Sequence, residues 1–169
     1  MTTPFAIRQA ISADAGAVRA LRLEALQGHP EAFASDYESE SKLDVAYWER
    51  RIAQQPLSTT FVAVAEPQLI GMCAVHGAER VKLKHNCTLA SVYVRPVWRG
   101  RAVAQALVAA AVALARERGF LVVKLAVIAD NAPAIRIYEH AGFRSYGVEP
   151  CVIRLNDVCY DELLMALRL

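Results

Sequence analysis

The pattern of apolar and polar residues divides the front of the chain into one strand and two helices. Residues 5–11 alternate between apolar and polar side chains, which predicts a half-buried β-strand. Residues 15–26 carry apolar side chains at helical spacing, and the Ser12-Ala13-Asp14 segment before them supplies capping groups. A second helix is predicted after Asp44, another cap residue. It should end before Pro56, because the residue preceding a proline disfavours helical backbone.

The rest of the chain alternates between strands and helices. One helix is predicted over about residues 101–118 and is ended by Gly119. Another begins at Asp130 or Asn131 and ends at Gly142. Apolar or alternating segments predict further strands at residues 60–65, 69–75, 87–94, 121–127, from 143–146 onward, and 158–167.

This order of elements, β-α-α-β-β-β-α-β-α-β-β, predicts an α/β (α+β) fold in a single domain over residues 1–169. Its central sheet is mixed, with an antiparallel front half, and helices flank it. The helix over residues 101–118 connects two strands that we expect to be parallel neighbours. Because ligands of open sheets bind at the carboxyl ends of such strands, the site is expected there.

Composition and charge narrow the function. Of the 169 residues, 55% are hydrophobic and 21% are charged, which is typical of a globular domain. The formal net charge of +2 disfavours a dedicated nucleic-acid binder, which usually carries a strongly basic face. No apolar run approaches the roughly 20 residues that span a bilayer, and no signal-peptide pattern is present. We therefore expect a cytoplasmic protein that binds neither nucleic acid nor membrane.

The cysteines and histidines show no ligand spacing. The four cysteines, Cys73, Cys87, Cys151 and Cys159, form no Cys-x-x-Cys pair, and three of them fall in apolar, strand-like runs. All four are predicted to be reduced thiols, with Cys151 beside Pro150 near the surface. The four histidines are scattered along the chain, so no metal site is expected.

The turn between the strand over residues 87–94 and the helix over residues 101–118 has the features of an anion site. The first N–H groups of a helix have no carbonyl partner, and the helix dipole makes that end positive. Two arginines add charge, so polyphosphate is the natural guest. Taken alone, the turn could also serve only as a crossover. Its sequence is Arg99-Gly100-Arg101-Ala102-Val103-Ala104.

This stretch closely resembles the acyl-CoA signature of the GNAT superfamily, Arg/Gln-x-x-Gly-x-Gly/Ala after a strand that ends in Val-x-Pro. The matching residues are Val94, Pro96, Arg99, Ala102 and Ala104. Ala102 replaces the central glycine of the signature. Alanine is tolerated there if the residue already lies in the first helical turn, and is a problem only if the position needs a positive φ or a very close backbone approach to phosphate. The resemblance implies the GNAT fold, with a splayed pair of parallel strands, and acetyl-CoA as the co-substrate without a metal.

The resemblance also implies how acetyl-CoA is held. Backbone groups of Val92 and Val94 would bond the pantetheine amides. A backbone N–H of Val92 or Tyr93 would face the thioester carbonyl. The residues that would cradle the pyrophosphate are Arg99, Gly100, Arg101, Ala102, Val103 and Ala104.

The second motif is Asn131-x-x-Ala134-x-x-x-Tyr138. Asn131 and Tyr138 lie seven residues apart, two helical turns, so both point to the same side. In GNAT enzymes the matching asparagine contacts the pantetheine arm, and the matching tyrosine is the general acid that protonates the departing thiolate. A phenol with a pKa of ~10 is protonated at pH 7 and suits that role. Read alone, Asn131 is a helix cap and Tyr138 a core residue.

The sequence thus predicts an N-acetyltransferase that moves an acetyl group from acetyl-CoA to a primary amine of a small molecule or peptide, by direct attack in a ternary complex. The alternative is a non-catalytic acyl-CoA-binding or regulatory domain of the same fold. A nucleotide-binding domain is disfavoured because neither a P-loop nor Gly-x-Gly-x-x-Gly is complete. Phe33, Tyr37 and Tyr146 are candidate walls of the acceptor pocket, or else pack helices on the sheet. The fold is compatible with a homodimer.

The general base stays unassigned. Many GNAT relatives carry a glutamate early on the strand before the pyrophosphate turn, but residues 86–92 contain no carboxylate. A water held by Thr88 or Ser91 could take the proton of the amine instead. The other candidates are carboxylates of the front loop: Glu31, Asp36 and Glu38.

Overall fold

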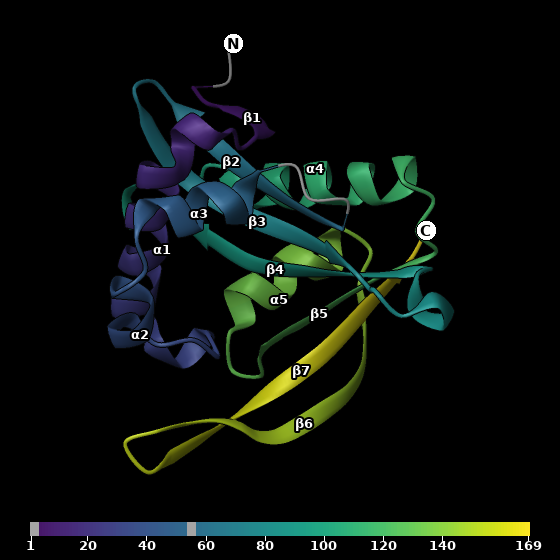
Figure 1. The fold of residues 1–169 in the computed structure, drawn as a ribbon. Helices are drawn as coiled ribbons and strands as arrows, with labels where there is room; N and C mark the ends of the chain where they lie inside the picture. Colours follow the sequence, from purple (N-terminus) through teal and green to yellow (C-terminus); the bar gives the residue numbers. More distant parts are fainter. Residues whose placement is uncertain (1–3, 54–56) are drawn as a thin grey trace.

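The computed structural model describes residues 4–53 and 57–169, and its elements are labelled in Figure 1. Pro56, before which the second predicted helix ends, lies outside these ranges. The strands are β1 (Ala6–Gln9), β2 (Ser58–Ala65), β3 (Gln68–Gly77), β4 (Asn86–Val94), β5 (Val122–Ile128), β6 (Arg144–Leu155) and β7 (Val158–Arg168). The helices are α1 (Ala15–Gly28), α2 (Tyr37–Ser41), α3 (Val45–Ile52), α4 (Val103–Glu117) and α5 (Ala132–His140). Short 3-10 turns are η1 (Ser12–Asp14), η2 (Pro30–Ala32), η3 (Val81–Leu83) and η4 (Pro96–Trp98).

The described strands form one sheet in the order β1-β2-β3-β4-β5-β7-β6. The β4–β5 pair is parallel, and the other neighbouring pairs are antiparallel. Helix α4 connects the parallel pair, as a crossover must. The predicted fold class, a mixed and mostly antiparallel sheet with flanking helices, is confirmed.

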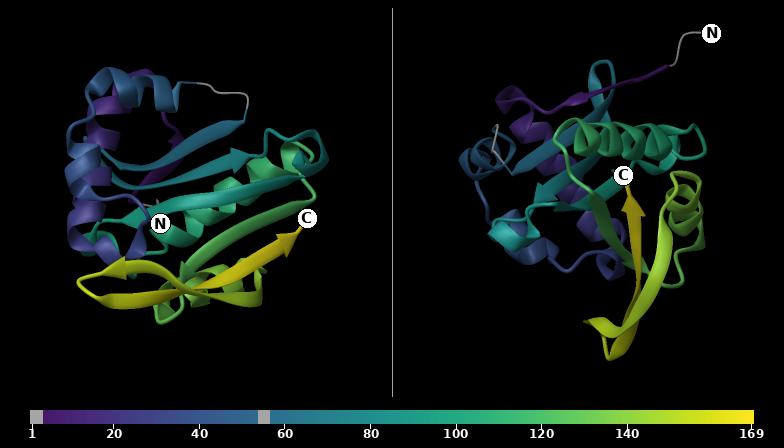
Figure 2. Two further views of the ribbon diagram at one scale, coloured as in Figure 1. Left: turned by 60° about the horizontal axis from the view of Figure 1, so that its bottom comes forward. Right: turned by 90° about the vertical axis from the view of Figure 1, so that its right-hand side faces the viewer.

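Helices cover both faces of the sheet (Figures 1 and 2). The side chains of β2 alternate between these two faces. Phe61 and Ala63 point into a core shared with α4 and α5. Val62 and Val64 point to the opposite face, into a second core shared with α1 and α3. A strand that is buried on both faces needs apolar residues at successive positions, which is the composition of this segment.

Helix capping follows the sequence at one predicted position and departs from it at another. The Asp44 carboxylate accepts a hydrogen bond of 2.7 Å from the N–H of Tyr47, as expected of the cap of α3. Asp14 instead binds Arg8, at 2.6 and 2.9 Å, and the N–H of Ile11. It therefore ties β1 to the start of α1 and does not cap the helix with its side chain.

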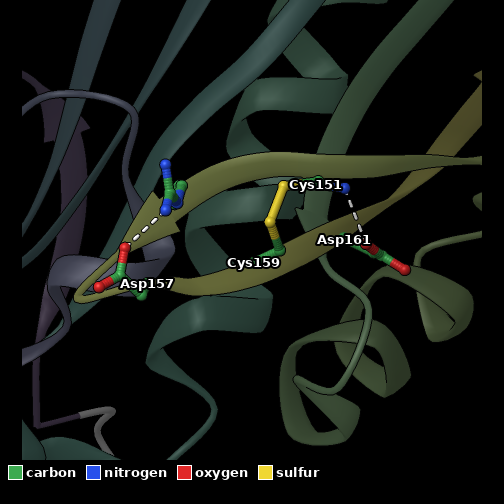
Figure 3. The surroundings of a disulfide bond; sticks show 5 residues. Cys151, Asp157, Cys159 and Asp161 are labelled. Atoms are coloured by element: carbon green, nitrogen blue, oxygen red, sulfur yellow. Dashed lines mark hydrogen bonds and ion pairs between the residues drawn. A yellow bond between two sulfur atoms is a disulfide. The ribbon is translucent and has the colours of Figure 1, made fainter.

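The cysteine prediction was half wrong. Cys73 and Cys87 are free and buried, as predicted. Cys151 and Cys159 form a disulfide across the β6–β7 hairpin (Figure 3). An irregularity in the pairing of β6 with β7 near Cys151 brings the two Cα atoms to 4.7 Å, within the range that a disulfide needs. Spacing alone does not reveal such a pair. Because disulfides are uncommon in reducing compartments, the cytoplasmic location stays a prediction.

Candidate active site

Strands β4 and β5 separate after a short parallel pairing. Their registered partners run only from Asn86 opposite Val122 to Thr88 opposite Lys124. Beyond Thr88, the pairing of β4 with β3 is also irregular, and Ser91 has a φ of 55°. The carboxyl half of β4 is therefore no longer bonded to β5, and this opening is the splayed pair that the fold was expected to contain.

A cavity of about 580 Å³ lies in this opening. It is lined by residues of β4, the start of α4, the end of β5, α5, β7 and the segment after α1. The lining residues on the sheet, on α4 and on α5 with its cap include Val92, Tyr93, Val94, Ala104, Ile128, Tyr160, Asn131 and Tyr138. Those on the segment after α1 include His29, Glu31 and Phe33. The cavity thus brings together most of the residues that the sequence predicted for the site.

A second cavity of about 460 Å³ adjoins the first and lies between the start of α4 and α5. The two share lining residues, among them Arg99, Ala104 and Pro133. The charged or ionisable residues that line the second cavity are Arg99, Arg136 and His140, and no described carboxylate lines it. This chemistry fits the phosphates of acetyl-CoA.

Helix α4 begins later than the predicted start at about residue 101, and this decides between the two alternatives for Ala102. Ala102 is not inside the first helical turn but is the N-cap, with φ 61° and ψ 15°. The chain thus needs a left-handed residue where the signature has glycine. Ala102 supplies no side-chain cap, so the N–H groups of Val103, Ala104 and Gln105 have neither a helical nor a cap acceptor. These three donors fit an anion.

Replacing Ala102 by glycine is expected to stabilise the protein by up to about 1 kcal/mol. Left-handed backbone costs a residue with a Cβ about 1–2 kcal/mol, and the greater freedom of glycine in the unfolded chain offsets up to about 1 kcal/mol. Urea unfolding checks this. Ala104→Gly, inside the helix, is the matched control and should lose about 0.5–1 kcal/mol. A loss of stability in Ala102→Gly would contradict the left-handed assignment.

Arg99 stands where the two cavities meet. Its Nε donates to the carbonyl of Val94 at 3.1 Å, and its Nη2 lies 2.9 Å from Nε2 of His29. The guanidinium also lies over the ring of Tyr93, 5.8 Å from its centroid. The other arginine of the turn, Arg101, packs on Trp98 at 5.2 Å and lines neither cavity. Arg99 is therefore the better placed of the two predicted phosphate ligands.

Removing the guanidinium in Arg99→Ala is expected to weaken acetyl-CoA binding about tenfold or more. A charge-assisted hydrogen bond to a phosphate contributes about 1.5–3 kcal/mol. Calorimetric titration with acetyl-CoA measures the change, and Arg101→Ala is the control, with an expected change of less than about threefold. Equal affinity of Arg99→Ala and the unaltered protein would rule out the phosphate role.

Tyr138 and Asn131 lie on one wall of the first cavity, as their spacing predicted. The Asn131 carboxamide accepts the N–H of Ala134 at 3.2 Å and so caps α5. Only 7% of Tyr138 is exposed, and burial raises the pKa of its phenol far above the ordinary value. Its hydroxyl bonds to no residue within 4–53 or 57–169, so the proton is available to a bound molecule.

The hydroxyl of Tyr93, another tyrosine that lines the first cavity, already has a hydrogen-bond partner. The Tyr93 hydroxyl donates to Glu24 at 3.0 Å, and Arg95 binds the second oxygen of the same carboxylate at 3.1 Å. Burial, followed by this hydrogen bond, raises the pKa of Tyr93 to about 12. Tyr93 therefore has a structural partner, which Tyr138 lacks in the described chain.

The acceptor side is only partly as predicted. Phe33 lines the first cavity, and its ring lies 4.8 Å from the guanidinium of the buried Arg22. Tyr37 begins α2, is 39% exposed and lines neither cavity; Tyr146 is exposed and also lines neither. His29, Tyr160 and Asp130 also line the first cavity, although none of them was predicted individually as a site residue. No motif marks them, because each arrives from a different part of the chain.

Two further findings concern metals and membranes. Among the residues that the structure describes, no three or more His, Cys, Asp or Glu side chains are grouped so that they could hold a metal ion. None of the described helices combines the length and the apolar character needed to cross a membrane.

Comparison with known proteins identifies the family. Residues 23–143 match the model of the Acetyltransferase (GNAT) family. The L-amino acid N-acetyltransferase AaaT of Escherichia coli is 27% identical over 162 residues, which cover 95% of each chain. The ribosomal-protein-alanine N-acetyltransferase of Brucella melitensis has a TM-score of 0.83 and is 26% identical, over 97% of this chain and 99% of its own.

A third relative carries the co-substrate. The structure of a Salmonella typhimurium acetyltransferase with its cofactor acetyl-CoA has a TM-score of 0.80 and is 22% identical, covering 98% of this chain and 94% of its own. The chain belongs to the GNAT family. It is an acyltransferase that uses acetyl-CoA as the acetyl donor.

Proposed function

We propose that this enzyme transfers the acetyl group of acetyl-CoA to a primary amine of a small molecule or peptide, by direct attack in a ternary complex. Residues 1–169 act as one catalytic domain in this proposal. The supporting observation is the first cavity, which is lined both by Tyr138 and Asn131 of α5 and its cap, and by His29, Glu31 and Phe33 of the segment after α1. Donor and acceptor can therefore meet in one space without a covalent enzyme intermediate.

Each group of residues has a separate role in the proposed reaction. Acetyl-CoA supplies an activated thioester. The turn from Arg99 to Ala104 anchors the pyrophosphate, and the freed backbone of Val92 and Val94 orients the pantetheine arm. The neutral amine attacks the thioester carbon, so that a C–N bond forms and the C–S bond breaks. The leaving thiolate takes the proton of Tyr138, which has no competing partner in the described chain.

The relatives favour an α-amine as the acceptor. The Escherichia coli relative is named for L-amino acids, and the Brucella relative for the alanine of a ribosomal protein. Both acceptors carry an amine on the carbon next to a carbonyl group. We therefore propose free L-amino acids and peptide N-termini as the first acceptors to test.

Thiol release from acetyl-CoA, followed across a panel of amines, tests the proposal. The panel contains free L-amino acids, short peptides with N-terminal alanine, and alkyl amines, each paired with its N-acetylated form as the control. Release above hydrolysis with at least one free amine, and none with its blocked form, is expected. Tight binding of acetyl-CoA without release on the whole panel would contradict it and favour a binding domain.

A further inference from the structure

One carboxylate of the front segment has access to the reaction space. Asp36 caps α2 by accepting the N–H of Ser39 at 2.8 Å. Glu38 is exposed and binds Lys42, and Glu40 is buried against Arg22. None of these three lines either cavity, whereas Glu31 lines the first. Of the front-loop bases that the sequence left open, only Glu31 is therefore placed beside a bound acceptor.

Glu31 is positioned by contacts that begin at Arg99, on the side of the site that would bind acetyl-CoA, and pass through His29. Arg99 only donates hydrogen bonds, so Nε2 of His29, 2.9 Å from its Nη2, must carry a lone pair. The ring proton of a neutral His29 then lies on Nδ1, which is 3.6 Å from a carboxylate oxygen of Glu31. The imidazole has no free lone pair for a substrate, but the carboxylate of Glu31 keeps its own. The pair thus presents Glu31, and not His29, as the proton acceptor.

We propose that Glu31 is the general base of the acetyl transfer, with His29 and Arg99 as its positioning residues; this rests on the proposed function. Glu31 takes the proton of the acceptor ammonium, and the neutral amine then attacks the thioester. Tyr138 gives its proton to the thiolate. As the amide forms, the attacking nitrogen gives its second proton to the tyrosinate, and Glu31 releases the first proton to solvent through the open cavity. Each turnover therefore converts the ammonium and acetyl-CoA into the amide, free CoA and one proton, and restores both side chains.

The other carboxylates near Glu31 are the alternative candidates for the general base. Asp130, in the turn before α5, lines the same cavity but is exposed, and its carboxylate bonds to no described residue. The η2 turn that contains Glu31 packs against α1, β5 and β6. Glu149 on β6 is opposite Glu162 on β7, and burial, followed by the charge of Glu149, raises the pKa of Glu162. Neither residue lines the first or the second cavity. Asp130 is thus the matched control.

The test compares Glu31→Gln with Asp130→Asn on an α-amine acceptor found in the panel. At pH 7, Glu31→Gln is expected to lower kcat by about 100-fold, while Asp130→Asn stays within about threefold. The loss in Glu31→Gln should shrink about tenfold between pH 7 and pH 9, because an α-amine with a pKa of ~8 becomes largely neutral and needs no base. A purely structural role would give the same loss at every pH.

The outcomes separate this assignment from the proposed function. If the unaltered enzyme acetylates no amine, the proposed function fails. If it turns over and Glu31→Gln keeps kcat, or raises only the acceptor KM, Glu31 is not the base. A large loss in Asp130→Asn instead would also overturn the assignment. For the positioning role, His29→Gln should retain more of kcat than His29→Ala, with acetyl-CoA affinity unchanged in both.

Discussion

Replacing Tyr138 by phenylalanine is expected to lower kcat by about 100-fold or more and to leave acetyl-CoA affinity within about twofold. The substitution removes one hydroxyl from a residue that is almost fully buried, so the packing against Phe143 is kept. What is lost is the proton for the departing thiolate, and a positioned acid contributes about 10²–10⁴-fold to such a step.

Steady-state kinetics with a saturating acceptor, together with calorimetric titration of acetyl-CoA, measure the two quantities. Tyr160→Phe is the matched control, since it removes a hydroxyl from another tyrosine of the same cavity, and its kcat should stay within about threefold. Because burial raises the pKa of Tyr138, the phenol stays protonated throughout the ordinary assay range. Tyr138 should therefore cause no loss of kcat between pH 7 and pH 9. An unchanged kcat in Tyr138→Phe would remove Tyr138 from the acid role.

Local sequence patterns predicted the helices and strands of this molecule well. Alternation, helical spacing and turn residues are properties of neighbouring positions, and they placed the strands, the crossover helix α4 and the cap at Asp44. The Asn131–Tyr138 spacing also held, because a short helix carries both residues to one wall of the cavity. The sequence therefore predicted that these two residues lie together, while their role in binding acetyl-CoA stays a prediction.

The sequence-based predictions failed where the local structure depends on an unusual backbone conformation or on contacts between distant parts of the chain. Ala102 reads as an ordinary helical residue, and only the observed start of α4 shows that it is left-handed. The partnership of Cys151 with Cys159 depends on an irregular pairing of two strands. The contact of Arg99 with His29 joins residues far apart in the sequence, and no local pattern encodes it. The acceptor side is built mainly from contacts of this last kind.

The buried pair of Arg22 and Glu40 should give the largest effect on stability. The two side chains are only 6% and 8% exposed and share hydrogen bonds of 3.0 and 2.9 Å. Burial by itself would raise the pKa of Glu40, but the hydrogen bonds and charge of Arg22 outweigh it and lower the pKa. This contribution to stability is therefore present above the ordinary carboxyl pKa, and is lost as the pH falls through the lowered one.

Glu40→Gln is expected to destabilise the protein by about 3–5 kcal/mol, because it leaves the guanidinium of Arg22 buried without a counter-ion. Urea unfolding at pH 7 measures the loss, and the difference between the two proteins should narrow below pH 4. The exposed pair of Glu38 and Lys42, 85% and 70% exposed, provides the control, and Glu38→Gln should cost less than about 0.5 kcal/mol. Since Arg22 also supports the ring of Phe33, Glu40→Gln should raise the acceptor KM as well. Equal unfolding midpoints for Glu40→Gln and the unaltered protein would show that the pair does not stabilise the fold.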